Sequence, residues 1–183
     1  GILSSIILPP ETEEQDLRRI MSELEQACDE LQIEILGGHT EVSDAVNRPV
    51  ITVTGVGKVA RDDLLSTGGM RPGDELVMTK WAGLEGSAII AAEKRDVLEQ
   101  TLPAHLIDTA ESFLKHISVV PEAKIAMQHG VHAMHDVTEG GIFGALWEMG
   151  AASGVGIVAD LDKIPIRQET IELCEVFDIN PYL

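Results

Sequence analysis

The sequence predicts a mixed α/β (α+β) protein that folds in two domains. Segments rich in β-branched residues alternate along the chain with segments whose apolar residues recur at helical spacing, which is typical of strands alternating with helices. The pairs Gly68-Gly69 and Pro72-Gly73 interrupt this alternation, and a domain boundary is predicted near residues 60–70. The length of 183 residues suits one large domain or two small ones.

The first predicted domain, residues 1–65, begins with a strand and a long helix. The apolar run Ile2–Leu8 predicts a buried strand that ends at a proline pair. A capping-box pattern at Thr12 and Gln15 then predicts the start of a helix. Apolar residues at helical spacing lay one stripe along it, namely Leu17, Ile20, Met21, Leu24, Ala27, Cys28 and Leu31. Each large side chain buried there contributes about 1.5–3 kcal/mol, so packing is expected to hold this helix.

Two more strands are predicted in this domain. Ile33–Leu36 is interpreted as a strand that leads into a glycine-rich loop, and the β-branched segment Val50–Val59 is interpreted as the next strand. The pair Gly55 and Gly57 lies within that second strand pattern and is too short for a nucleotide fingerprint. The sequence contains no Walker loop, Rossmann fingerprint or catalytic triad.

The second predicted domain, residues 66–183, alternates strands with helices. The predicted strands are Glu75–Thr79, Val131–Met134 and Val155–Ala159. The predicted helices are Glu85–Glu93, Ala104–His116, Pro121–His129, Ile142–Ala152 and Glu169–Phe177. Pro121 in a first turn and Gly130 after a last turn are typical helix boundaries.

The charge balance excludes some classes of partner. The chain has 13 Lys plus Arg against 31 Asp plus Glu, a formal net charge of −18 at pH 7. Such a surface repels polyanions, so neither nucleic acid nor an anionic membrane is expected as a partner. A single nucleotide remains compatible, because a divalent cation can neutralise its phosphates locally. No apolar run has the length of a membrane span and no signal segment opens the chain, so a cytoplasmic location is expected.

The ends and the cysteines carry less information. The chain begins at Gly1 and stops at Leu183 without an evident closing element, so we expect a fragment. Cys28 and Cys174 lie far apart, each in a helical apolar pattern, and are interpreted as buried cytosolic thiols. Sequence spacing leaves a disulfide open, and neither cysteine has a nearby base that would mark a nucleophile.

Two segments combine the end of a predicted strand, paired glycines and polar or acidic side chains. They are Gly37–Glu41 (GGHTE) and Asp136–Gly141 (DVTEGG). In the second segment the glycines open a helix whose free N–H groups can meet a phosphate. Asp136 is placed to bind a Mg²⁺ that bridges phosphate oxygens, and Thr138 can add a hydroxyl or cap the helix. Paired glycines also make simple turns, and from the residues alone both interpretations stay open.

Lys80 and three histidines are weaker candidates. Lys80 follows a predicted strand, and a phosphate contact and a solvated surface position are both compatible with it. His129, His132 and His135 precede Asp136 and invite a transition-metal interpretation. However, a glycine breaks the helix after His129, and on a strand His132 and His135 would face opposite sides. Exposed or hydrogen-bonding histidines are therefore the favoured interpretation.

Taken in order, these segments resemble the superfamily of aminoimidazole ribonucleotide (AIR) synthetase. Gly37–Glu41 resembles its GG-x-T segment, Met70–Thr79 its entry into the C-terminal domain, and His135–Gly141 its D-x-[ST]-x-G-G/L element. Ala152–Ile157, with Ile164–Ile166 after it, is similar to the branch of hydrogenase maturation proteins. Selenophosphate synthetase and thiamine-monophosphate kinase are also members of this superfamily.

The resemblance implies a two-domain AIR synthetase-like (PurM-like) fold, incomplete at both ends in this chain. It also implies a homodimer formed through the N-terminal domains, with ATP in a cleft between domains and Mg²⁺ held by acidic residues. Residues expected at the nucleotide are Gly37, Gly38, His39, Thr40, Lys80, Thr138, Gly140 and Gly141, and those expected at the metal are Asp136 and Glu41. Several relatives carry Asp or Glu where this chain has His39, so a metal ligand is either lost there or replaced by Glu41.

The leading hypothesis is an ATP- and Mg²⁺-dependent enzyme that phosphorylates an amide-type oxygen on a small molecule or a protein, nearest the hydrogenase maturation branch. Catalysis would come mostly from positioning and charge stabilisation. One alternative is AIR synthetase itself, and another is a non-catalytic dimeric scaffold with a degenerate ATP site. Because the family's acidic N-terminal segment and closing part lie outside this sequence, this chain alone is expected to be inactive.

Overall fold

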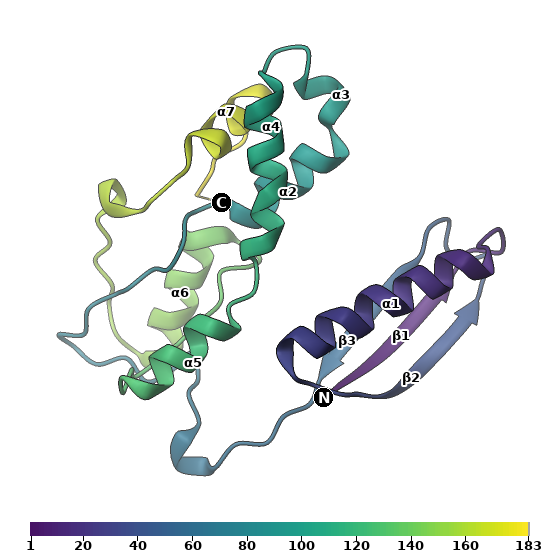
Figure 1. Cartoon of the computed structure of the whole chain (residues 1–183). Helices are drawn as coiled ribbons and strands as arrows, with labels where there is room; N and C mark the ends of the chain where they lie inside the picture. The colour runs from purple at the N-terminus through teal and green to yellow at the C-terminus, as the bar shows by residue number, and fades with distance from the viewer. Residues whose placement is uncertain (183) are drawn as a thin grey trace. The chain divides into compact units, whose positions relative to one another are not determined.

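The chain divides between Asp62 and Asp63 into two units, each with its own contacts. This division is seen in the computed structural model, which describes residues 1–182 (Figure 1). The two units are described separately below. Among the helices of these residues, none has the length and apolar composition needed to cross a bilayer.

The first unit is a three-stranded sheet with one helix. Strand β1 (Ile2–Leu8) is central in the order β2-β1-β3. It pairs in parallel with β2 (Ile35–Val42) and antiparallel with β3 (Val50–Gly55). Helix α1 (Glu14–Leu31) connects β1 to β2 and runs along one face of the sheet (Figure 1). A helix between two parallel strands is the connection that such pairing requires.

Burial alternates along β1 as expected for a sheet with one covered face. Ile6 is 1% exposed, and Ile2, Ser4 and Leu8 are also buried, whereas Leu3 is 43% exposed. Successive side chains of a strand point to opposite faces, so the buried set faces α1. The strand predicted at Ile2–Leu8 is confirmed.

The glycine pair in the first unit lies inside a strand and not in a loop. The sequence predicted that the strand ends at Leu36, but β2 continues to Val42. A Cβ atom on Gly38 would lie 1.9 Å from the carbonyl oxygen of Ser4 in β1, and Gly38 has a φ of +159°. The glycine therefore permits a close approach of two strands, and the predicted loop is wrong because this tertiary contact gives no local signal.

Two boundaries in this unit also differ from the prediction. The capping box of α1 is formed by Glu13 and Asp16, one residue later than the predicted Thr12 and Gln15. The Asp16 carboxylate accepts a hydrogen bond of 3.3 Å from the Glu13 N–H. Strand β3 ends at Gly55, short of the predicted end at Val59.

The second unit is built from helices. They are α2 (Leu84–Glu93), α3 (Arg95–Leu98), α4 (Ala104–Glu111), α5 (Val120–Gln128), α6 (Gly141–Ser153) and α7 (Gln168–Phe177). Short 3₁₀ turns occur at Arg61–Asp63, Ser112–His116 and Leu161–Lys163. The five predicted helices are thus confirmed, except that the one predicted over Ala104–His116 ends its α-helical part at Glu111.

The core of this unit lies where α2, α4 and α7 pack together (Figure 1). Its buried members are Ala88, Ala91, Leu98, Ile107, Ala110, Phe113 and Leu173. Alanines on α2 and α4 allow the helices to approach closely, and the larger side chains fill the remaining space. A buried hydrogen bond of 2.9 Å between Ser87 Oγ and Thr170 Oγ1 joins α2 to α7.

The three strands predicted for the second unit do not form among residues 63–182. These segments are not part of any ladder, and an isolated bridge between Ala82 and Ile166 is the pairing found there. Val77 is 85% exposed and Val158 is 98% exposed. A β-branched run becomes a strand only when a neighbour satisfies its N–H and C=O groups, and these runs have no such neighbour in the described chain.

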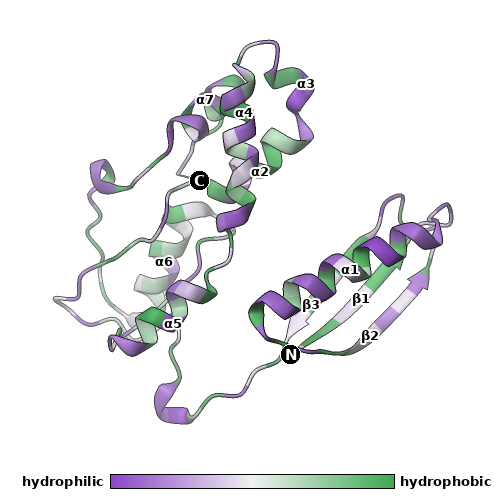
Figure 2. Ribbon diagram, in the orientation of Figure 1, coloured by the Kyte–Doolittle hydropathy of each residue, from purple (hydrophilic) through white to green (hydrophobic). Residues whose placement is uncertain are grey.

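Helix α6 differs from the other helices in composition. Its sequence, GIFGALWEMGAAS, consists mostly of apolar and small residues, and Figure 2 shows the helix largely in green and pale colours. Ile142 and Ala145 are buried, whereas Trp147 is 73% exposed. Glu148 is the single charged residue in the sequence of α6. The Glu148 side chain is 52% exposed, and its contact with His135 is described with the site below.

Candidate functional site

The second glycine pair forms the entry into α6. Gly140 is the N-cap with a φ of 77°, and Gly141 has a φ of 61°. Both values lie in the left-handed region, which glycine adopts without the steric cost that a Cβ atom brings. A Cβ atom on Gly140 would also lie 3.4 Å from Gly144 Cα. The pair therefore turns the chain sharply into the helix, as the sequence predicted.

Two amide groups at this helix start already have acceptors. The Gly141 N–H donates to the Thr138 carbonyl over 3.2 Å, and the Ile142 N–H donates to the Tyr182 carbonyl over 3.1 Å. The ring of Tyr182 stacks on Phe143 with 5.7 Å between centroids and 18° between planes. A phosphate at this end of α6 would have to use other donors or displace these carbonyls. The predicted phosphate contacts of Gly140 and Gly141 therefore stay predictions.

Asp136 lies just before this turn and contacts His135, whose other ring nitrogen contacts Glu148. The Asp136 side chain is 61% exposed, and its Oδ1 lies 3.4 Å from His135 Nδ1. His135 Nε2 lies 2.5 Å from Glu148 Oε2, and the His135 side chain is 15% exposed. The hydrogen bond that His135 donates to Glu148, with a smaller contribution from Asp136, raises the pKa of His135 above its ordinary value despite partial burial.

The donor set around Asp136 fits Mg²⁺ only in part. In the ion pairs of residues 1–182, Asp136 contacts His135 and neither Lys nor Arg, so its carboxylate is open to a hard cation. No three His, Cys, Asp or Glu side chains of these residues form a group that could hold a metal ion by themselves. Mg²⁺ is commonly held by one or two carboxylates together with substrate phosphates, and Asp136 suits that arrangement.

The residues predicted around the first glycine pair divide between the two faces of the sheet. The register pairs Ser5 with His39 and Ile7 with Glu41, so both side chains lie on the face away from α1. His39 Nε2 lies 3.2 Å from Glu41 Oε2 there. Thr40 pairs with Ile6 and belongs to the face that α1 covers. Neighbours on a strand alternate in direction, so Thr40 and Glu41 point to opposite faces of the sheet, and their predicted roles at the nucleotide and the metal stay predictions.

Lys80 is already engaged within its own unit. Its Nζ donates to the Ser118 carbonyl over 2.6 Å and lies 2.8 Å from Glu122 Oε1. Its side chain is 19% exposed, and its φ is 61°. The hydrogen bond from Lys80 lowers the pKa of Glu122 below its ordinary value. A phosphate contact by Lys80 stays a prediction and would have to compete with these partners.

Comparison with known proteins places these features in one family. Residues 1–59 match the N-terminal domain of AIR synthase related proteins, and residues 71–180 match the C-terminal domain. The chain belongs to the AIR synthase related family. The predicted mixed α/β, AIR synthetase-like fold is confirmed. The glycine segment Gly37–Glu41 lies in the first match and Asp136–Gly141 in the second.

Curated and solved relatives agree with this assignment. The carbamoyl dehydratase HypE of Cupriavidus necator is 33% identical over 174 residues, which cover 91% of this chain and 46% of that protein. A selenide, water dikinase of Myxococcus xanthus is 31% identical over 173 residues, covering 94% and 47%. The crystal structure of the hydrogenase maturation protein HypE in complex with ATP has a TM-score of 0.74 at 21% identity, covering 99% and 52%. The chain spans about half the length of the curated relatives that it matches.

The three histidines of the predicted cluster act as hydrogen-bonding groups in this AIR synthase related chain. His132 Nδ1 lies 2.9 Å from Asp74 Oδ2, which also accepts a bond of 2.8 Å from the Arg71 N–H. The bond to His132, followed by that from Arg71, lowers the pKa of Asp74. His129 Nδ1 lies 2.9 Å from the carbonyl of Ile125 in its own helix.

Sequence reasoning missed Glu122, Glu148 and an aromatic group around Trp81. The Trp81 ring meets Phe113 edge-on at 5.0 Å, and the Arg167 guanidinium lies 4.7 Å from its centroid. Such contacts join segments that lie far apart in the chain, so no local sequence pattern predicts them. The single signal was for Glu148, the one charge in an apolar helical pattern.

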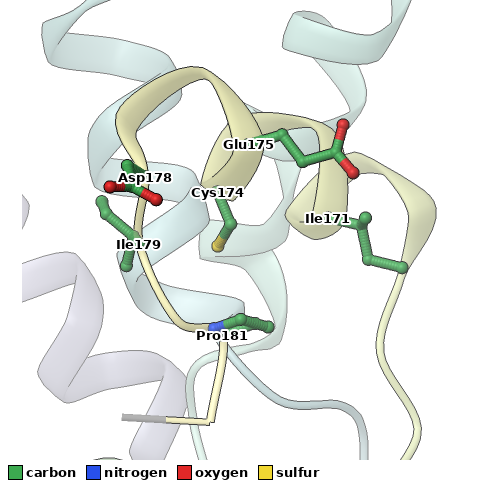
Figure 3. A pocket seen from close by; sticks show the side chains of 6 residues that line it. All are labelled: Ile171, Cys174, Glu175, Asp178, Ile179 and Pro181. Carbon is green, nitrogen blue, oxygen red and sulfur yellow. The ribbon is translucent and has the colours of Figure 1, made fainter.

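A shallow cavity of about 270 Å³ lies beside α7 (Figure 3). Its lining residues are Ile171, Cys174, Glu175, Asp178, Ile179 and Pro181, and none of the predicted site residues is among them. Cys174 is thus partly accessible, whereas Cys28 is buried, and both thiols are free. Burial raises the pKa of the Cys174 thiol, which disfavours the thiolate.

Proposed function

We propose that the protein is an ATP- and Mg²⁺-dependent enzyme that activates an amide-type oxygen by phosphoryl transfer. The observation that carries the proposal is the open carboxylate of Asp136 just before the glycine turn into α6, inside the segment matched to the family. The match to a carbamoyl dehydratase and the similar fold of an ATP-bound hydrogenase maturation protein support it. An amide or carboxamide substrate, free or attached to a protein, is part of the proposal.

In this proposal Asp136 would hold Mg²⁺, with phosphate oxygens as further ligands. Bound there, Mg²⁺ would neutralise charge on the β- and γ-phosphates. Thr138 lies in the turn before α6 and is exposed, so its hydroxyl can reach a bound nucleotide. The chain itself would contribute mainly orientation of the phosphoryl group, which is the main need in this chemistry.

The proposal includes a homodimer formed through the first unit and a cytoplasmic location. On the sheet face away from α1, Leu3 is 43% exposed and Val50 is 40% exposed, which supports an apolar contact with a second copy. The net charge of −18 argues against nucleic acid and anionic membranes as partners.

Calorimetric titration of the full-length protein with Mg·ATP tests the proposal. The wild-type protein should bind, and Asp136→Ala should weaken binding by about tenfold or more, which equals ~1.4 kcal/mol. Glu93→Ala, which removes an exposed carboxylate on α2, is the matched control and should bind as the wild type does. Unchanged affinity in Asp136→Ala would refute the metal role. If no nucleotide shifts the thermal midpoint of the full-length wild-type protein, a non-catalytic scaffold replaces the enzyme.

A further inference from the structure

The carboxylate of Glu148 is directed at a single histidine. Glu148 lies midway along the length of α6, and its Oε2 contacts His135 Nε2 over 2.5 Å. It carries the only charge in the sequence of that helix. The contact gives the half-exposed carboxylate one hydrogen-bond partner in the protein and restricts the orientation of the imidazole ring.

The same histidine faces Asp136 with its other nitrogen. His135 Nδ1 lies 3.4 Å from Asp136 Oδ1. The histidine is 15% exposed, whereas the side chains of Asp136 and Glu148 are 61% and 52% exposed. The imidazole is therefore the most buried member of the three, and it lies between two carboxylates that are exposed to solvent.

We propose that Glu148 and His135 are positioning residues for Asp136. Glu148 orients the imidazole, whose Nδ1 contacts one oxygen of Asp136 and leaves the second oxygen free for a cation. This inference rests on the proposed function, since it assumes that Asp136 binds the metal. Residues that orient a ligand in this way commonly change metal affinity by about 10- to 100-fold when they are removed.

A purely structural role is the alternative, because the pair also ties the segment before α6 to that helix. The two roles differ in what they change. A structural defect would weaken binding of ATP with or without metal. A positioning defect would weaken the binding of the metal ion and leave the binding of metal-free ATP unchanged.

The experiment measures Mn²⁺, as a paramagnetic substitute for Mg²⁺, by electron paramagnetic resonance in the presence of ATP. His135→Ala and Glu148→Ala should each weaken Mn²⁺ binding by about tenfold. Glu148→Gln should stay within about threefold of the wild type, because its amide oxygen accepts the same hydrogen bond. Binding of ATP in excess EDTA should be equal in all variants, and Glu93→Ala serves as the control.

Each outcome bears on the inference separately from the proposed function. If Asp136→Ala weakens Mn²⁺ binding and Glu148→Ala does not, the positioning role is wrong and the proposed function stands. If Glu148→Ala weakens metal-free ATP binding as much as Mn²⁺ binding, the pair is structural and the inference is also wrong. If Asp136→Ala leaves Mn²⁺ binding unchanged, both the metal role and its positioning residues are refuted.

Discussion

The ammonium group of Lys80 lies 2.8 Å from Glu122 Oε1, and the side chains are 19% and 26% exposed. The same ammonium donates to the Ser118 carbonyl, so it joins the segment before α2 to the start of α5. One oxygen of the carboxylate, Glu122 Oε2, is buried without a hydrogen-bond partner among residues 1–182. The pair is thus partly desolvated, and this distinguishes it from the surface ion pairs of the chain.

We predict that Lys80→Met lowers the free energy of unfolding by about 1 kcal/mol near neutral pH. Lys80 lowers the pKa of Glu122, so its contribution is complete above the ordinary value of 4.5 and is lost as the pH falls through the lower folded value. Urea unfolding from neutral to acid pH should show the difference between variant and wild type shrinking. Lys163→Met is the control, because the Lys163 side chain is 82% exposed beside Asp160 and should cost little. An equal effect of both changes would contradict the prediction.

The contact between His135 and Glu148 should stabilise the fold with the opposite pH dependence. Glu148 raises the pKa of His135, so the contribution is complete below the ordinary value of 6.5 and is lost as the pH rises through the higher folded value. Thermal unfolding of wild type and His135→Gln should therefore differ most in mild acid and converge in mild alkali. A difference that grows with rising pH would show that the histidine is not held as a cation.

Much of the first unit was predictable because its signals are local. The strand over Ile2–Leu8 and the helix after it follow from apolar periodicity, and both are present. The extension of β2 through Gly38 was not predictable, because the reason for that glycine is the backbone of Ser4, more than thirty residues earlier. A glycine pair gives the same local pattern in a turn and at a close strand contact.

In the second unit, too, local sequence patterns did not predict the features that depend on contacts between distant segments. Helices α2, α5 and α6 were predicted because a helix satisfies its own backbone. The segment around Val77 was predicted as a strand from composition, but composition does not supply the neighbour that a strand needs. Asp136 was predicted from its motif and stays a prediction, whereas the contact of His135 with Glu148 arises only when α6 packs beside the segment that precedes it.

Gly38→Ala tests the close approach of β1 and β2. The added Cβ would meet the Ser4 carbonyl at 1.9 Å and the backbone would have to leave its φ of +159°. We predict a loss of at least about 2 kcal/mol in the free energy of unfolding, because backbone on both sides must shift. Gly57→Ala is the control, since nothing lies within 4 Å of its Cβ position. Denaturant unfolding checks both, and equal stabilities would refute the close contact.

The buried pair of Ser87 and Thr170 offers a test of the core between α2 and α7. Both residues are at most 4% exposed, and their hydroxyl groups are 2.9 Å apart. Thr170→Val keeps the shape but leaves the Ser87 hydroxyl without its partner, so we predict a loss of about 1–3 kcal/mol. Adding Ser87→Ala to that variant should recover part of the lost free energy of unfolding, because the unpaired Ser87 hydroxyl is then removed. A double-mutant cycle by urea unfolding measures this coupling, and strictly additive effects would show that the two hydroxyls do not depend on each other.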